Sequence, residues 1–226
     1  MLSQPGQKQV YFNQYWQTRD LPSADARSRQ RAALVQSLLP APQGNKLLEV
    51  GCGRGEVMRY LASQGYQATG CDIASEAVSR LKSDGFDVFL CDLEKDPVPG
   101  HYDVILCLEV LQQLFDPAVA LQKLGYSLNP GGRLIVSVPN EFHIQSRLRL
   151  LMGKSHLGHF DQSHIRLFTP QRAQELFERV GLTIEVTIPV PVFPPGWGFF
   201  RLPGQIMAQT LPSLFSLSQI YRLKVK

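Results

Sequence analysis

Short apolar runs alternate with amphipathic stretches along most of the chain. Each run is followed by a polar or glycine-containing turn, and the stretches between runs carry apolar residues three or four positions apart. Such runs predict strands that are buried on both faces, and the amphipathic stretches predict helices that pack on them. The predicted strands are 46–50, 67–71, 86–90, 102–107, 133–138, 182–188 and 217–225.

Helices are predicted between these strands. One helix, 23–39, precedes the first strand. The others are a helix that ends at Gly65, a helix over 75–83, a helix that begins at Pro117 after the capping Asp116, and a helix from Pro170 to Val180. The turn 129–132 is expected to lead into the strand 133–138. Because strands and helices alternate, we expect an α/β fold with a largely parallel sheet.

Length and charge restrict the function only broadly. The chain has 226 residues, 44% of them hydrophobic, and we expect one domain over 1–226. The net charge of +4 is mild and no basic run is present, so no nucleic-acid partner is expected. The first residues lack the pattern of a signal peptide, and no apolar stretch is long enough for a spanning helix. We therefore expect a cytoplasmic protein.

The four cysteines do not form a metal or disulfide pattern. They are Cys52, Cys71, Cys91 and Cys107, and they show neither a C-x-x-C motif nor histidines at ligand spacing. Each lies at or just after the end of one of the first four strands. We expect no metal, and we interpret the thiols as small side chains that pack close to a ligand rather than as redox sensors.

A glycine-rich loop follows the first strand. Gly51, Gly53 and Gly55 allow positive φ angles and a close approach of a ligand, and the next helix offers unpaired N–H groups. A dinucleotide-binding fingerprint would need glycine at 56, where Glu56 stands, so a nicotinamide dehydrogenase is disfavoured. The loop predicts a different nucleoside-like ligand.

Aspartates end the next two strands in the same way. Asp72 comes 17 residues after Gly55, where a neighbouring parallel strand would bring a carboxylate to both hydroxyls of a ribose. Asp92 repeats the order cysteine, aspartate and apolar residue that surrounds Asp72. The repeat predicts that both acids lie at one edge of the sheet.

Several segments together resemble the class I S-adenosylmethionine (SAM) dependent methyltransferases, in particular the ubiquinone-biosynthesis type and the methionine-biosynthesis W family. They are 49–55, Asp72, 92–93, 109–111, 129–132 and 164–169, and the resemblance spans roughly residues 45 to 188. It implies a Rossmann-like, seven-stranded, mostly parallel sheet with helices on both faces and the last strand antiparallel. It also implies SAM as cofactor and methyl transfer to a small acceptor.

The resemblance further implies which residues contact the cofactor. In these enzymes the acid after the third strand accepts from the adenine amino group and the next apolar residue packs on the ring, which Asp92 and Leu93 match. The predicted cofactor residues are Glu49, Gly51, Cys52, Gly53, Gly55, Asp72, Ile73, Asp92, Leu93, Cys107 and Leu108.

Two segments leave the sheet at the edge where the ligand is expected. We expect 139–168 and 189–215 to form caps over an acceptor pocket, and 1–40 to form a helical cover. The aromatic cluster at 11–16 either lies over the ligand or packs on the sheet edge. Four of the five histidines fall in 139–168, and His159 is our candidate for a general base.

One departure affects the catalytic prediction. Ubiquinone-type enzymes usually continue Glu-x-x-Glu-His after the fourth strand, whereas Gln112 and Gln113 stand here. The corresponding imidazole is missing. A catalytically inactive, SAM-binding partner subunit of another enzyme is therefore the alternative to an active methyltransferase.

Residues 186–221 are unusually apolar. The segment has Arg201 as its only charged residue, contains several aromatic residues, and is interrupted by prolines. This composition favours an apolar or lipid-like acceptor and peripheral contact with a membrane interface. A self-buried cap or a homodimer contact is the alternative.

Overall fold

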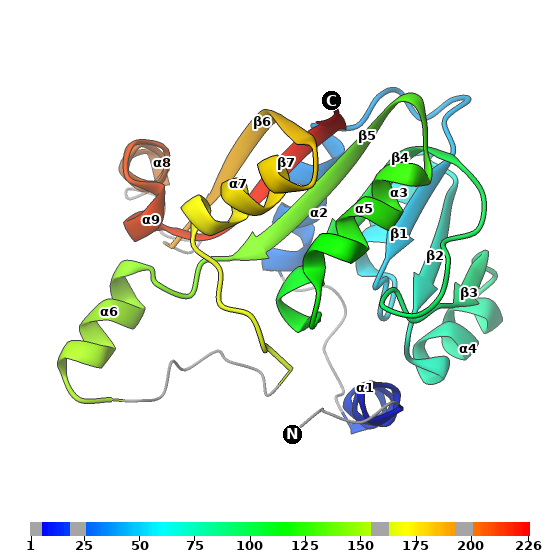
Figure 1. Cartoon of the computed structure of the whole chain (residues 1–226), viewed down its shortest axis with the longest axis horizontal. Helices are drawn as coiled ribbons and strands as arrows, with labels where there is room; N and C mark the ends of the chain where they lie inside the picture. The colour runs from blue at the N-terminus through cyan, green and yellow to red at the C-terminus, as the bar shows by residue number, and fades with distance from the viewer. Residues whose placement is uncertain (1–5, 19–25, 155–162, 193–200) are drawn as a thin grey trace.

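Figure 1 shows a computed structural model that describes residues 6–18, 26–154, 163–192 and 201–226. Its centre is a seven-stranded sheet with the order β3-β2-β1-β4-β5-β7-β6. The strands are β1 Leu47–Val50, β2 Ala68–Asp72, β3 Val88–Leu90, β4 Tyr102–Leu108, β5 Leu128–Pro139, β6 Leu182–Pro191 and β7 Ser216–Val225. The first five strands are mutually parallel, and β7 runs antiparallel to both β5 and β6. The predicted fold class is confirmed.

Helices cover both faces of this sheet. In chain order they are α1 Gln7–Thr18, α2 Ala26–Gln36, α3 Glu56–Ser63, α4 Ser75–Ser83, α5 Pro117–Tyr126, α6 Ile144–Leu151, α7 Pro170–Arg179, α8 Arg201–Thr210 and α9 Pro212–Phe215, with a short 3-10 helix, η1, at Leu111–Gln113. Alternate residues of β4 enter different cores. Ile105 packs with Leu121 of α5 and Phe177 of α7, whereas Leu106 packs with residues of α2 and α3.

Several predicted boundaries differ from the structure: β6 continues to Pro191 rather than ending at 188, α2 ends at Gln36 rather than at 39, and β5 and β3 differ as well. The segment 129–132, expected as a turn, belongs to β5, although the pairing with β4 is irregular between Tyr102 and Val104. A Cβ on Gly132 would lie 3.1 Å from the backbone oxygen of Asp103, so the strands approach closely there because this residue is glycine. The strand predicted at 86–90 is shorter and begins at Val88.

Two groups of helices contribute no residue to the two core clusters that cover the sheet. α1 crosses the region below the ends of β1 to β4, whereas α6, α8 and α9 lie together at another end of the molecule (Figure 1). Asn140, just before α6, ties these segments together, because its Nδ2 donates to backbone oxygens of Pro212, Ser213 and Ser216. In the part of the chain that the structure describes, no helix is long and apolar enough to cross a membrane.

Candidate cofactor site

A cavity of about 380 Å³ opens at the carboxyl ends of the first four strands. Parallel strands bring their carboxyl ends to one edge, so residues distant in sequence meet there. Nine of the residues predicted to contact the cofactor line this cavity: Glu49, Gly51, Cys52, Gly53, Asp72, Ile73, Asp92, Leu93 and Leu108. The structure therefore brings most of the predicted site together.

The glycine loop has the backbone conformation that its sequence requires. Gly53 has φ +51°, and a Cβ added there would lie 2.6 Å from Cζ2 of Trp16. Gly51 has φ +68°, and a Cβ there would lie 2.5 Å from a methyl carbon of Val110. These two positions therefore exclude side chains for steric as well as conformational reasons.

Asp72 organises the loop as well as facing the cavity. Its two carboxylate oxygens accept from the amides of Gly53 and Ala74, each at 2.8 Å. Burial raises the pKa of Asp72, and these backbone hydrogen bonds oppose that rise. Each oxygen keeps a further lone pair, so the carboxylate can still accept from a diol.

Glu49 is a buried carboxylate next to a guanidinium from another element. Burial raises the pKa of Glu49 to about 8, and the Arg31 charge on α2 works against that rise. Oε2 of Glu49 and Nε of Arg31 are both buried without a hydrogen-bond partner among the described residues. Arg31 was not predicted as a site residue, because nothing in its helical sequence context distinguishes it from a surface arginine.

Asp92 lies further along the same edge. Its Oδ1 accepts from the amide of Glu94 at 3.1 Å, and Lys95 Nζ lies 2.9 Å from its Oδ2. Leu93 is 7% exposed and belongs to the core on that face. Asp92 and Leu93 therefore offer one fixed carboxylate beside one apolar surface.

Glu109, at the end of β4, was not among the predicted site residues. It lines the cavity with an unusual positive φ of 57°, and its Oε1 accepts from Ser137 Oγ at 2.8 Å. Burial raises the pKa of Glu109, and Arg31 counteracts this. A non-glycine residue held in this conformation is a frequent feature of functional sites.

Two of the residues predicted to contact the cofactor do not line the cavity. Gly55 packs against Leu81 rather than lining the cavity, and Cys107 is fully buried in the core, so their contact with a cofactor stays a prediction. His159 lies outside the described residues. Of the described residues in 139–168 and 189–215, Ser163 alone lines the cavity, and the role of these segments in acceptor binding also stays a prediction.

The described histidines of 139–168 have structural partners. Nε2 of His143 lies 3.2 Å from Ser146 Oγ, and Nδ1 of His164 lies 3.5 Å from Oε1 of the buried Glu141. Among the described residues no group of three or more histidine, cysteine or acidic side chains is placed to hold a metal ion.

The aromatic segment near the N-terminus closes the cavity from the side opposite the sheet edge. Phe12, Tyr15 and Trp16 of α1 line the cavity, as does Lys8. These residues lie at the cavity, and their role as a cover over a bound cofactor stays a prediction.

A family model described as "Methyltransferase domain" matches residues 23–186. The chain belongs to this methyltransferase family. It is 28% identical over 153 residues to a ubiquinone biosynthesis O-methyltransferase from Aeromonas salmonicida, a match that covers 62% of this chain and 64% of that protein. A protein of the same name from Idiomarina loihiensis is 29% identical over 168 residues, covering 69% of this chain and 68% of that one. The matches thus span about two thirds of the length of these relatives.

The fold of this methyltransferase-family chain is shared with solved structures. A magnesium protoporphyrin IX methyltransferase from Synechocystis with bound S-adenosylhomocysteine (SAH) has a TM-score of 0.67 at 17% identity, over 97% of this chain and 98% of that one. The predicted family and its cofactor, SAM, are thereby confirmed at the level of the family.

Proposed function

We propose that the protein transfers the methyl group of SAM to a small acceptor. The observation that carries this proposal is that Glu49 and Arg31 both line the cavity that contains the glycine loop, each with a buried polar atom that lacks a partner among the described residues. Glu49 Oε2 and Arg31 Nε are buried without hydrogen-bond partners among the described residues, one a carboxyl oxygen that can accept from a cation and the other a cationic donor. Buried polar groups need partners, and the α-ammonium and carboxylate of a methionine moiety would supply both.

The remaining parts of the cofactor match the residues farther along the edge. Asp72 offers its remaining lone pairs to the ribose hydroxyls, and Asp92 with Leu93 offers an acceptor and an apolar surface to adenine. When bound, SAM supplies an activated methyl group on its sulfonium. The protein then has to orient the acceptor, exclude water and, for a hydroxyl acceptor, take up one proton.

Glu109 lies where a proton acceptor would be useful. In the pairing of β1 with β4, Val50 lies opposite Cys107, so Glu109 after β4 lies near the glycine loop after β1. Burial raises the pKa of Glu109. A carboxylate with a raised pKa is a better general base than an exposed one. His159 stays a second candidate for this role.

Calorimetry with SAM, SAH and NAD tests the cofactor assignment. We expect SAM and SAH to bind and NAD not to bind. Asp72→Asn should weaken SAH by about tenfold or more, because one charge-assisted acceptor of the ribose hydroxyls is lost. The control Asp84→Asn changes an exposed aspartate far from the cavity. Equal loss in both variants, or unchanged affinity in Asp72→Asn, would contradict the assignment.

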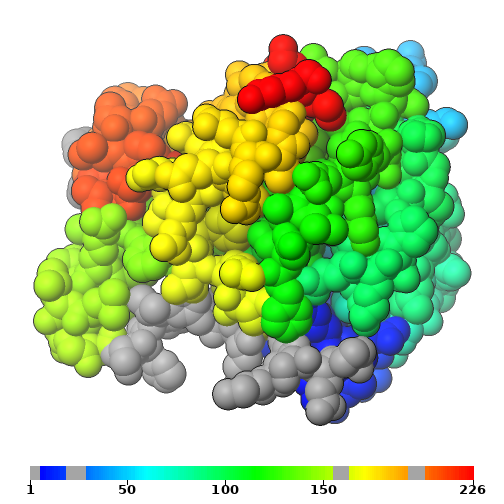
Figure 2. Space-filling view, viewed as in Figure 1, coloured from blue at the N-terminus to red at the C-terminus, as the bar shows by residue number. Residues whose placement is uncertain are grey.

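We further propose that the acceptor is apolar or lipid-like and is met at a membrane interface. We call the exposed apolar residues around α6 and α8 the acceptor end: Leu148, Leu150, Leu151, Met152, Leu202, Ile206 and Leu211, each between 45% and 84% exposed. Figure 2 shows α6 directly beside α8 and α9 on the surface. Arg147, Arg149 and Lys154 accompany these residues, and no acidic residue occurs in 142–154. Exposed apolar side chains together with basic ones suit an anionic bilayer surface.

Flotation with phosphatidylglycerol and phosphatidylcholine vesicles tests this surface. We expect the wild type to float with the anionic vesicles and Leu148→Ser/Leu151→Ser to lose binding. Tyr126→Ser is the matched control, because Tyr126 is 81% exposed on α5. No flotation, with dimers in sedimentation equilibrium that Leu148→Ser/Leu151→Ser abolishes, would favour a homodimer contact instead.

A SAM-binding partner subunit without turnover is the second candidate. It is favoured by Gln112 and Gln113, which replace acidic and imidazole groups of the enzymes that the chain resembles. In the structure Gln112 is buried and donates from Nε2 to the backbone oxygen of Glu109 at 2.8 Å. Lipid and quinone extracts incubated with labelled SAM, followed by detection of methylated product and SAH, distinguish the two functions. Tight binding without product would favour the partner subunit.

A further inference from the structure

α1 crosses the cofactor cavity and is fastened at three places. Lys8, near its start, binds Glu94 beside Asp92. In its middle, Asn13 Oδ1 accepts from the amide of Glu76 at 3.2 Å, at the beginning of α4. Near its end, the backbone oxygen of Trp16 accepts from Arg54 Nη2 at 2.7 Å. The three contacts lie beside Asp92, at the start of α4 and at the glycine loop. A cofactor bound as proposed along this edge would therefore lie beneath α1.

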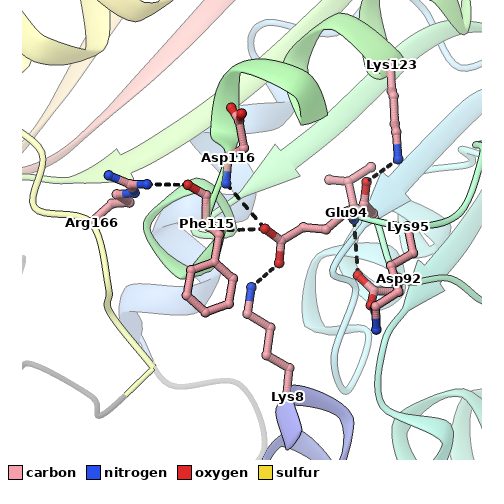
Figure 3. Close-up of polar contacts among 9 residues, drawn as sticks. Lys8, Asp92, Glu94, Lys95, Phe115, Asp116, Lys123 and Arg166 are labelled. Carbon is pink, nitrogen blue, oxygen red and sulfur yellow. Dashed lines mark hydrogen bonds and ion pairs between the residues drawn. The ribbon is translucent and has the colours of Figure 1, made fainter. Parts of the chain in front are cut away.

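The contact at Lys8 is the most enclosed of the three. Lys8 is 9% exposed, its ammonium binds the Glu94 carboxylate, and its Nζ lies 4.3 Å from the centroid of the Phe115 ring. Figure 3 shows this lysine reaching from α1 between Glu94 and Phe115. Removing either partner of such an enclosed ion pair leaves the other charge buried without its partner, which is costly, and the cation–π contact would be lost with the lysine.

Glu94 anchors this contact to the body of the protein. Its Oε1 accepts from the amides of Phe115 at 2.7 Å and Asp116 at 3.3 Å, at the start of α5. Arg166 donates to the backbone oxygen of Phe115 from the other side (Figure 3). The acceptor of Lys8 is therefore held in place by elements that do not include α1.

The rest of α1 is attached weakly to the core. Lys8 is its only buried residue, whereas α3, α4, α5 and α7 each bury three or more residues, apolar ones among them. Phe12, Tyr15 and Trp16 are half-buried at the cavity and belong to no core cluster, so α1 loses less hydrophobic stabilisation than those helices when it detaches. The polar contacts of α1, with Lys8 foremost, therefore decide how often it opens.

We propose that α1 is a gate over the cofactor site and that Lys8, Glu94 and Phe115 form its latch. This inference rests on the proposed SAM site. The cofactor enters and leaves when the latch is open, and the closed gate shields the reacting groups from water. Since the latch consists of protein groups alone, it resists opening equally before and after cofactor binds.

This arrangement makes a kinetic prediction that a simple binding contact does not. Weakening the latch raises the open fraction of both the free and the bound protein. The association and dissociation rate constants for SAH should then rise by the same factor, while the dissociation constant stays nearly unchanged. Loss of a direct contact to SAH would instead raise the dissociation rate constant alone.

Stopped-flow fluorescence with SAH measures both rate constants. The chain has two tryptophans, so Trp197→Phe leaves Trp16, which lines the cavity, as the only reporter. In this background we expect Lys8→Ala and Glu94→Gln each to raise both rate constants by about tenfold, the factor that corresponds to about 1.4 kcal/mol. The double variant should add little to either one, because both remove the same contact. Lys46→Ala removes an exposed lysine charge elsewhere and should change neither rate.

Each outcome decides between specific alternatives. Calorimetry on the wild type first establishes that SAH binds, and a failure there would overturn the proposed function together with the gate. If SAH binds but Lys8→Ala leaves both rate constants unchanged, the gate is wrong and the function stands. A rise confined to the dissociation rate constant would make Lys8 a cofactor contact and would also overturn the gate.

Discussion

The cofactor edge and the acceptor end of this molecule are built in opposite ways. At the cofactor edge ionisable groups are buried: Asp72 is 6% exposed and Glu49 is 4% exposed. At the acceptor end apolar groups are exposed, as Leu151 at 84% illustrates. Each arrangement costs free energy unless a partner compensates it. The cofactor edge needs an ionic and polar partner, and the acceptor end needs an apolar one. The two regions therefore indicate two ligands of different chemistry.

The sheet explains why the geometry of the cofactor edge is fixed by backbone groups whereas that of the acceptor end is not. The cofactor edge is formed where parallel strands end, so backbone amides such as those of Gly53 and Ala74 are already in place to bind Asp72. α6 and α8 follow β5 and β6, and neither helix contributes a residue to the two core clusters that cover the sheet, although α8 packs beside β6. Their exposed residues can change without disturbing the strands, so the surface that we propose for the acceptor can vary while the cofactor edge stays constant.

The largest predicted effect is that of a side chain on Gly53. Gly53→Val should weaken SAH by at least about a hundredfold in calorimetry, since valine resists positive φ and its Cβ would collide with Trp16. Binding to anionic vesicles should be unchanged, because the acceptor end is separate. Gly85→Val is the control: Gly85 has φ +85° with open space around its Cβ, so this variant tests backbone strain without the collision. Equal loss of affinity in the two variants would contradict the steric explanation.

The sequence predicted the cofactor edge better than it predicted the rest of the site. Glycines at alternate positions and aspartates after successive strands are local patterns, and a parallel sheet fixes where they meet. Arg31 and Lys8 reach the cavity from helices whose placement depends on tertiary packing, so no local pattern marked them. Cys107 follows the same spacing as the other cysteines, but it lies within β4, and its side chain packs in the core rather than lining the cavity.

The pH dependence of stability tests whether the cofactor edge buries an ionisable group at a cost, and Glu49→Gln is the variant for this test. Burial raises the pKa of Glu49 to about 8, so the folded protein holds this proton at pH values where the unfolded chain has released it. The free energy of unfolding therefore falls as pH rises from about 5 to 8, and the expected loss is on the order of a few kcal/mol. Glu49→Gln should remove this loss and melt at a higher temperature than the wild type at pH 8.

The same variant should lose affinity while it gains stability. Ionised Glu49 is the proposed partner of the cofactor ammonium, so wild-type affinity for SAH should rise from pH 6 to 8 as the carboxylate ionises. Glu49→Gln should show little rise and bind about fivefold more weakly at pH 8, because a charge-assisted hydrogen bond becomes a neutral one. Calorimetry and thermal melts at both pH values measure the two effects. Parallel pH profiles for wild type and variant would show that Glu49 does not titrate in the site.

The smallest predicted effect concerns the reactivity of the cysteines. Cys52, Cys71 and Cys91 line the cavity, whereas Cys107 is fully buried in the core. The hydrogen bond from Cys71 lowers the pKa of the Cys91 thiol, while burial raises the pKa of Cys107 to about 12. Thiolates react with alkylating agents and thiols do not, so Cys91 should be labelled first.

Saturating SAH should slow this labelling at the cavity, and labelling of Cys107 reports any general change in opening. We expect iodoacetamide to modify Cys91 at least about threefold more slowly with SAH, through direct shielding and through suppression of local opening. Cys52 should be protected in the same direction. The ratio of Cys91 to Cys107 labelling, followed by mass spectrometry, separates the two causes, because shielding lowers the rate at Cys91 alone whereas a general loss of opening lowers both. Identical labelling of Cys91 with and without SAH, in protein shown to bind it, would place the cofactor away from the end of β3.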